Sequence, residues 1–200
     1  MSASTELIKE LRETTGAGVL DCKKALDEAG GDMEKAAAIL HERGLAKAAK
    51  KADRETEAGV LDMYSHGEGR VGVMVEVNCE TDFVARTDEF REFAHEMALQ
   101  VAATSPQWVG ADEVPEDVLA ERRAAFTEEA LGEGKPEDVV ERIVEGRMAK
   151  FLGESCLLGQ AYIRDDSKMV EELLKETVAA IGENIQIRRF VRWEVAEEIA

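Results

Sequence analysis

Residues 71–78 constrain the fold more than any other stretch, because valine occupies every second position. Strict alternation has the two-residue period of a half-buried β-strand, and valine favours strands. A second segment with strand character, residues 60–65, lies just before the turn sequence HGEGR. The sequence therefore predicts a β-hairpin with one valine face, made of Val71, Val73, Val75 and Val77.

Three short helices are predicted before the hairpin, at residues 4–14, at residues 19–29 and from the capping residue Asp32 to Gly44. The glycines that follow each pattern are expected to end these helices. The basic run 47–55 is interpreted as an exposed helical extension that acts as a linker. In the second helix, burial is expected for Val19, Cys22, Ala25, Leu26 and Ala29.

Four more helices and a strand are predicted after the hairpin. One helix begins at Thr87, two follow Pro115 and Pro136, and one runs from Ser167 to Gly182. A final strand is expected at residues 185–195. Strands at both ends of a helical middle predict an α+β fold, with a small antiparallel sheet packed by helices. The helix after Thr87 is expected to bury Phe90, Phe93, Ala94, Met97, Ala98 and Val101.

The charge of the chain argues against nucleic acid as a direct partner. The formal net charge is −18, whereas binding to a phosphate backbone depends on lysine and arginine. Residues 1–55 carry ten Lys/Arg against eleven Asp/Glu, and the rest carries fifteen against thirty-two. This asymmetry predicts two parts with different surfaces. We also expect a cytoplasmic location without membrane attachment, because there is no signal-peptide or membrane-spanning pattern and the three cysteines are widely separated.

No motif predicts an enzyme active site, a metal site or a cofactor site. GEGRVG matches a dinucleotide fingerprint, but it lies between two predicted strands and no helix follows it, so a hairpin turn is the better interpretation. The three histidines fall in three different predicted elements, and none has a ligand partner at metal-binding spacing. We therefore expect a binding protein that is not an enzyme and has no cofactor.

The segment NCETDFVARTDEF, residues 78–90, links a predicted strand to a predicted helix. It places the carboxylate of Asp82 beside the aromatic ring of Phe83. One interpretation is that Phe83 packs onto the core while Thr81 or Asp82 caps a turn. The alternative is that Asp82 and Phe83 are exposed and offered to a partner. Spacing alone favours the first and leaves both open.

Several segments together resemble the elongation factor Ts family. They are LRETTGAGVLDCKKALDEAGGD (11–32), GLAKAAKKADRE (44–55), VEVNCETDFVAR (75–86), EGKPEDVVERIVEGRMAKF (133–151) and IGENIQIRRF (181–190). The resemblance covers nearly the whole chain, and TDFVAR with GENIQIRR is its most specific part. It implies a three-helix domain of the ubiquitin-associated type at residues 1–54 and a core at residues 55–200.

The resemblance also implies a function: guanine-nucleotide exchange on the GTPase elongation factor Tu during translation elongation. Thr81, Asp82, Phe83 and Val84 would correspond to the segment that disturbs the GTPase's magnesium and nucleotide site. Arg12, Val19, Leu20 and Lys23 would correspond to the patch that docks on its GTP-binding domain. An adaptor that binds a peptide or ubiquitin-like partner without exchange activity is the alternative function.

The chain resembles the short form of the family, because it has one hairpin and one TDFVAR segment where longer members have two core subdomains. A surface that the long form makes from two core units would then need two chains. We therefore expect a homodimer. The apolar residues Val191 and Trp193 on the final strand agree with this expectation.

Overall fold

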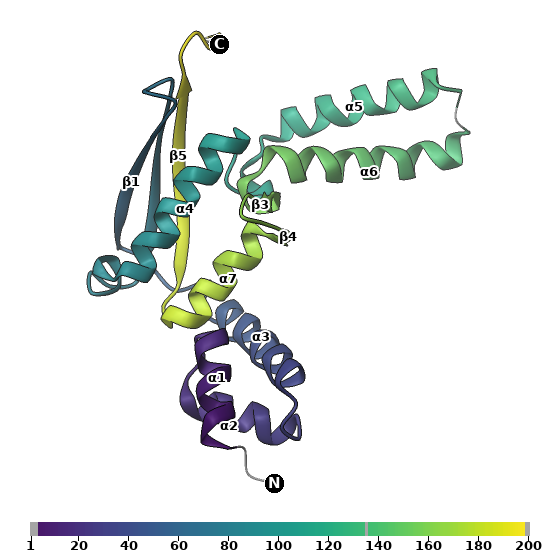
Figure 1. The fold of residues 1–200 in the computed structure, drawn as a ribbon. Helices are drawn as coiled ribbons and strands as arrows, with labels where there is room; N and C mark the ends of the chain where they lie inside the picture. Colours follow the sequence, from purple (N-terminus) through teal and green to yellow (C-terminus); the bar gives the residue numbers. More distant parts are fainter. Residues whose placement is uncertain (1–3, 135, 199–200) are drawn as a thin grey trace. The chain divides into compact units, whose positions relative to one another are not determined.

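A computed structural model describes residues 4–134 and 136–198, and Figure 1 shows the order of the elements along the chain. These residues form two compact units. The first contains the residues up to Gly59 together with Asn78–Phe90 and Glu172–Gln186. The second contains Val60–Val77, Arg91–Glu171 and the residues from Ile187 on. Each unit is therefore built from segments that are far apart in the sequence.

The first unit begins with three helices, α1 (Thr5–Thr15), α2 (Val19–Glu28) and α3 (Met33–Ala49). Ser4 caps α1 by accepting a hydrogen bond from the Leu7 amide, and Asp32 caps α3 in the same way through the Lys35 amide. The amphipathic faces of the three helices enclose one small core, as the sequence predicted. Its buried members are Leu11, Cys22, Ala25, Leu26, Ala36 and Leu40.

The prediction that α3 ends at Gly44 was wrong, because the helix continues to Ala49. A Cβ atom at position 44 would lie 3.1 Å from the Cβ of Ala179, on α7 (Val170–Ile181). Glycine therefore serves the close approach of two helices here and does not break the helix. The predicted exposed extension forms the last turn of α3 and the turns after it, where the Lys51 ammonium donates to the Gly182 carbonyl at 2.6 Å.

The sheet has three strands in the order β1 (Ala58–His66), β2 (Val71–Cys79) and β5 (Ile185–Glu194). The predicted hairpin joins β1 to β2, and the GEGRVG glycines Gly67 and Gly69 have positive φ angles in its turn. This backbone conformation suits glycine and leaves no helix N-terminus for a pyrophosphate, so the hairpin interpretation is confirmed. All four valines of the predicted face are buried.

Helix α4 (Asp88–Thr104) crosses one face of the sheet (Figure 1). Thr87 caps it, accepting from the Phe90 amide at 3.3 Å, and the six residues predicted to be buried are all buried. His95 on α4 contacts Asp62 of β1 at 2.9 Å, and Arg192 of β5 donates to the Ala102 carbonyl of α4. The neighbours of Asp62 and Arg192 along their strands therefore face away from α4.

The second unit also contains an antiparallel helical hairpin, α5 (Glu116–Gly132) and α6 (Glu137–Ser155), which begins after Pro115 and Pro136 as predicted. Ala130, Val140, Val144 and Met148 form its buried seam. A small hairpin, β3 (Ala161–Tyr162) and β4 (Asp165–Met169), follows it and was not predicted. Ser167 lies in β4, so the prediction that it opens the next helix was wrong. The Ser167 hydroxyl donates a hydrogen bond to the Asp165 carboxylate at 2.6 Å.

The α+β class, with three N-terminal helices and a small antiparallel sheet, is confirmed. Within residues 4–134 and 136–198, no helix combines the length and the apolar character that crossing a bilayer requires.

Candidate functional site

The candidate site is the loop that leaves β2 at Cys79 and reaches α4 at Thr87. It contains a single 3₁₀ turn, Val84–Arg86. The Thr81 hydroxyl accepts from the Val84 amide, and the Thr81 carbonyl accepts from the Ala85 amide at 3.2 Å. Thr81 therefore caps the turn and closes the loop locally, as one sequence interpretation predicted.

A carboxylate from a distant segment holds the base of this loop. Glu183 accepts one hydrogen bond from the Thr81 amide at 3.0 Å and another from the Thr81 hydroxyl at 2.7 Å. The Cys79 thiol donates to the Thr81 carbonyl at 3.2 Å. Burial and the nearby Glu183 carboxylate raise the pKa of Cys79, which keeps this thiol protonated as a donor.

A second carboxylate continues the same network. Glu80 accepts from the Asn184 amide at 2.6 Å, and this bond, with help from Arg54, lowers the pKa of Glu80. Buried Asn184 in turn donates from its side chain to the carbonyls of Ala52 at 3.1 Å and Arg54 at 2.8 Å. The base of the loop is therefore fixed to the turn after α7 and to the chain after α3.

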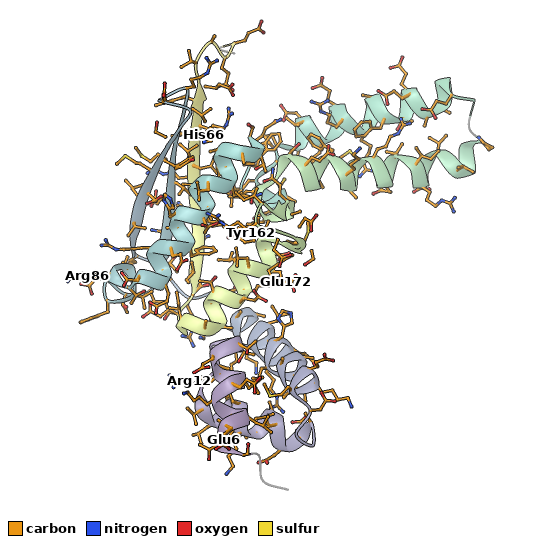
Figure 2. The ribbon with its side chains drawn as sticks, viewed as in Figure 1. Glu6, Arg12, His66, Arg86, Tyr162 and Glu172 are labelled. Atoms are coloured by element: carbon orange, nitrogen blue, oxygen red, sulfur yellow. The ribbon has the colours of Figure 1, made fainter. Side chains whose placement is uncertain are left out.

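The tip of the loop points into solvent. Phe83 is 81% exposed, so the interpretation in which it packs onto the core was wrong. Asp82 is also exposed and contacts Arg86 at 2.8 Å, four residues along the chain. Figure 2 labels Arg86 on this loop. Ion pairs between such exposed side chains contribute little to stability, so Asp82 is not committed to holding the fold. Val84, the next residue after Phe83, is half-buried.

The four residues expected to dock are exposed on α1 and α2 of the first unit. On α2, Lys23 lies four positions after Val19 and three positions after Leu20, which places it beside both on one side of that helix. Arg12 comes from α1, where Figure 2 labels it. The prediction that Val19 is buried was wrong: Val19 is 51% and Leu20 72% exposed. Position 19 is the first residue of α2, one turn before the buried Cys22.

Two residues that hold the loop, Glu183 and Asn184, were not identified from the sequence. They follow Gly182, which ends α7 with a φ angle of 90°. A polar pair directly after a helix-ending glycine was the available signal, and it lies inside the segment IGENIQIRRF. Their function is positional, because their partners are 102 and 104 residues away along the chain.

Comparisons with known proteins match most of the chain. A family model described as "Elongation factor TS" matches residues 29–197. Proteins named Elongation factor Ts are similar over nearly their whole length. The protein from Thermoanaerobacter sp. (strain X514) is 59% identical over 98% of this chain and 96% of its own length. The proteins from Coprothermobacter proteolyticus and Thermosipho melanesiensis are 51% and 52% identical, over 98% and 97% of this chain and 100% and 99% of their own lengths.

These matches place the chain among translation elongation factors. The chain belongs to the elongation factor Ts family.

Proposed function

We propose that this protein is a guanine-nucleotide exchange factor that binds elongation factor Tu and promotes release of its GDP. The observation that carries the proposal is the exposure of Phe83, at 81%, on a loop whose base is fixed by Glu183. An apolar ring held in water by a rigid support is poised to be buried against a partner. Membership of the elongation factor Ts family supports the same partner.

The mechanism is linkage and needs no covalent chemistry in this chain. A protein that binds the nucleotide-free GTPase more tightly than the GDP-bound form must weaken GDP binding by the same factor. A ten-thousandfold weakening requires a difference of about 5.5 kcal/mol between the two states. Contacts that exist only in the opened GTPase supply this difference.

Phe83 and Asp82 would supply different parts of it. A phenylalanine ring buries ~150–250 Å² when it enters a pocket, and at ~25 cal/mol per Å² this contributes a few kcal/mol. Asp82 would act by charge, either competing for the ligand shell of the bound magnesium ion or repelling the adjacent phosphate. Thr81 and Val84 would hold these two side chains in place.

Docking would fall to the N-terminal part, residues 1–54, while exchange and dimerisation would belong to residues 55–200. Exposed Val19 and Leu20 offer apolar contact area, and Arg12 and Lys23 offer positive charge beside it. Such a patch suits a protein surface of the opposite charge. The proposed setting is the cytoplasm, without direct contact to nucleic acid or to a membrane.

We also propose that the protein is a homodimer. The sheet face turned away from α4 is apolar and exposed: Leu61 is 59%, Met63 69%, Met74 39%, Val191 45% and Trp193 74% exposed. A face built by three strands of one unit can meet its copy about a two-fold axis, and stable pairs bury roughly 800 Å² on each partner. Light scattering should give twice the 22.0 kDa chain mass, and Val191→Asp should give the monomer. A monomer in the unmodified protein would refute this proposal.

A fluorescent-GDP release assay with purified elongation factor Tu tests the exchange function. Addition of this protein should accelerate release, and Phe83→Ala should remove most of the acceleration. An adaptor would bind the GTPase or another partner without changing the release rate. Asp82→Ala should also slow release, with a defect that depends on magnesium concentration if the metal is its target.

A further inference from the structure

A histidine and two glutamates from distant parts of the sequence meet in the first unit. His41 lies on α3, whereas Glu172 and Glu176 lie on α7, where Figure 2 labels Glu172. The Nε2 atom of His41 is 3.2 Å from the carboxylate of Glu172, and its Nδ1 atom is 3.3 Å from that of Glu176. One potential ligand atom from each of the three residues lies within 4.8 Å of the others.

The side chains of this cluster have the chemistry of a zinc site. Zinc binds imidazole nitrogen and carboxylate oxygen at about 2.0–2.2 Å, and it accepts three protein ligands with a water in the fourth position. Two carboxylates on one helix, four residues apart, face the same direction and supply two negative charges. Magnesium and calcium prefer sites made entirely of oxygen ligands, so the histidine favours a transition metal.

The packing around the cluster holds the two helices in place before any ion binds. Gly44 is one turn after His41 on α3, and Ala179 is one turn after Glu176 on α7. A Cβ atom at Gly44 would be 3.1 Å from the Cβ of Ala179, so the helices touch at this point. Ligands on two helices that already touch lose little freedom on binding a metal.

We propose that His41, Glu172 and Glu176 form a zinc-binding site that fastens α3 to α7. Ligand atoms at about 2.1 Å around a tetrahedral ion lie roughly 3.4 Å apart. The three ligand atoms here lie within 4.8 Å of one another, and the two carboxylates contact different ring nitrogens of His41, so side-chain rotations that bring both carboxylates to one nitrogen complete the site. One ring nitrogen of His41 binds the ion, and the other can donate its N–H to water, as zinc-bound histidines do in some sites. This site is independent of the proposed exchange function.

The test uses the full-length protein, stripped of metal with a chelator and titrated with zinc chloride against a chromophoric zinc indicator. We expect one zinc ion per chain and a rise in melting temperature on saturation. His41→Gln should weaken binding by at least about 100-fold and abolish the rise, because a ligand is lost. The paired change Glu172→Gln with Glu176→Gln should do the same.

His95→Gln is the matched control, because His95 also contacts a carboxylate, that of Asp62 at 2.9 Å, but lies outside the cluster. This variant should leave zinc binding unchanged. The three cysteines are buried in the folded chain, so thiols do not offer a competing site on the native surface. Absence of stoichiometric zinc binding, or binding within twofold of the unmodified protein in both cluster variants, would overturn the proposal. Millimolar magnesium in place of zinc should leave the melting temperature unchanged, and an equal rise would overturn the assignment to zinc.

Discussion

Phe83→Ala should impair nucleotide exchange while leaving the protein's own stability almost unchanged. The side chain is 81% exposed, so only about one-fifth of its surface contributes to the fold. With a full burial of ~200 Å², that fifth corresponds to about 40 Å², or about 1 kcal/mol at most. For a chain of this size, 1 kcal/mol shifts the melting temperature by roughly 2–4 °C.

The loss in function should be larger, because the exposed remainder becomes available to the partner. About 160 Å² of newly buried ring is worth about 4 kcal/mol, which corresponds to roughly a thousandfold in the release rate if the ring is buried only in the opened GTPase. The assay is fluorescent-GDP release from elongation factor Tu at saturating exchange factor. Thermal unfolding of the same variant provides the stability measurement.

Two further variants separate a specific role of Phe83 from general effects of removing an apolar side chain. Phe90→Ala removes a ring that is 0% exposed and should cost ~3–5 kcal/mol of stability. Leu131→Ala removes a side chain that is 51% exposed at the end of α5 and should leave exchange unchanged, with a stability loss of about 1 kcal/mol from its buried half. A Phe83→Ala variant that loses several kcal/mol of stability, or that releases GDP at the unmodified rate, would refute the reasoning.

Three further predictions concern the loop support, the docking patch and the half-buried Tyr162. Glu183→Gln should weaken both hydrogen bonds that Thr81 donates to this side chain. GDP release should slow about tenfold, and the stability loss should be near 1 kcal/mol. Recovery of the release rate in Glu183→Asp would indicate that the negative charge holds the loop. Leu20→Ala should raise the dissociation constant for elongation factor Tu about tenfold without a change in melting temperature, since Leu20 is 72% exposed; an unchanged constant in calorimetry would remove it from the docking patch. Partial burial and the Glu96 carboxylate raise the pKa of Tyr162 to about 12. The stability that the neutral phenol contributes should therefore be fully present below about pH 10 and lost as the pH rises from about 10 to 12. Tyr162→Phe should flatten this part of the stability–pH curve, and an unchanged curve would contradict the assignment.

The elements that the sequence predicted correctly are those in which local pattern and tertiary packing agree. The alternating valines formed β2, and the apolar stripe after Thr87 formed the buried side of α4. Gly44 and Ser167 were misinterpreted because each was assigned its commonest local role. The close contact of Gly44 with Ala179, 135 positions later, leaves no trace in the residues around Gly44. Local propensity is overridden where distant segments meet.

The candidate loop shows the same limit more sharply. Its sequence marked Asp82 and Phe83 as an unusual pair but could not decide whether Phe83 was buried. That outcome depends on how the loop is held, and the residues that hold it, Glu183 and Asn184, come from the turn after α7. Spacing within residues 78–90 contains no information about those partners. The resemblance to a family favoured exposure where local reasoning could not.

The division of the loop into a fixed base and an exposed tip is what differential binding requires. A side chain can shift an equilibrium between two states of a partner only through contacts that differ between them. Were Phe83 packed against its own chain, entering a pocket on the partner would first require breaking that packing, and the gain would shrink accordingly. Were the base mobile, ordering it on binding would cost about 1–2 kcal/mol for each residue. The hydrogen bonds that Thr81 donates to Glu183 and Asn184 donates to Glu80 already order the base of the loop in the folded protein, so this entropy is not lost again on binding. The area of Phe83 therefore remains available for the partner.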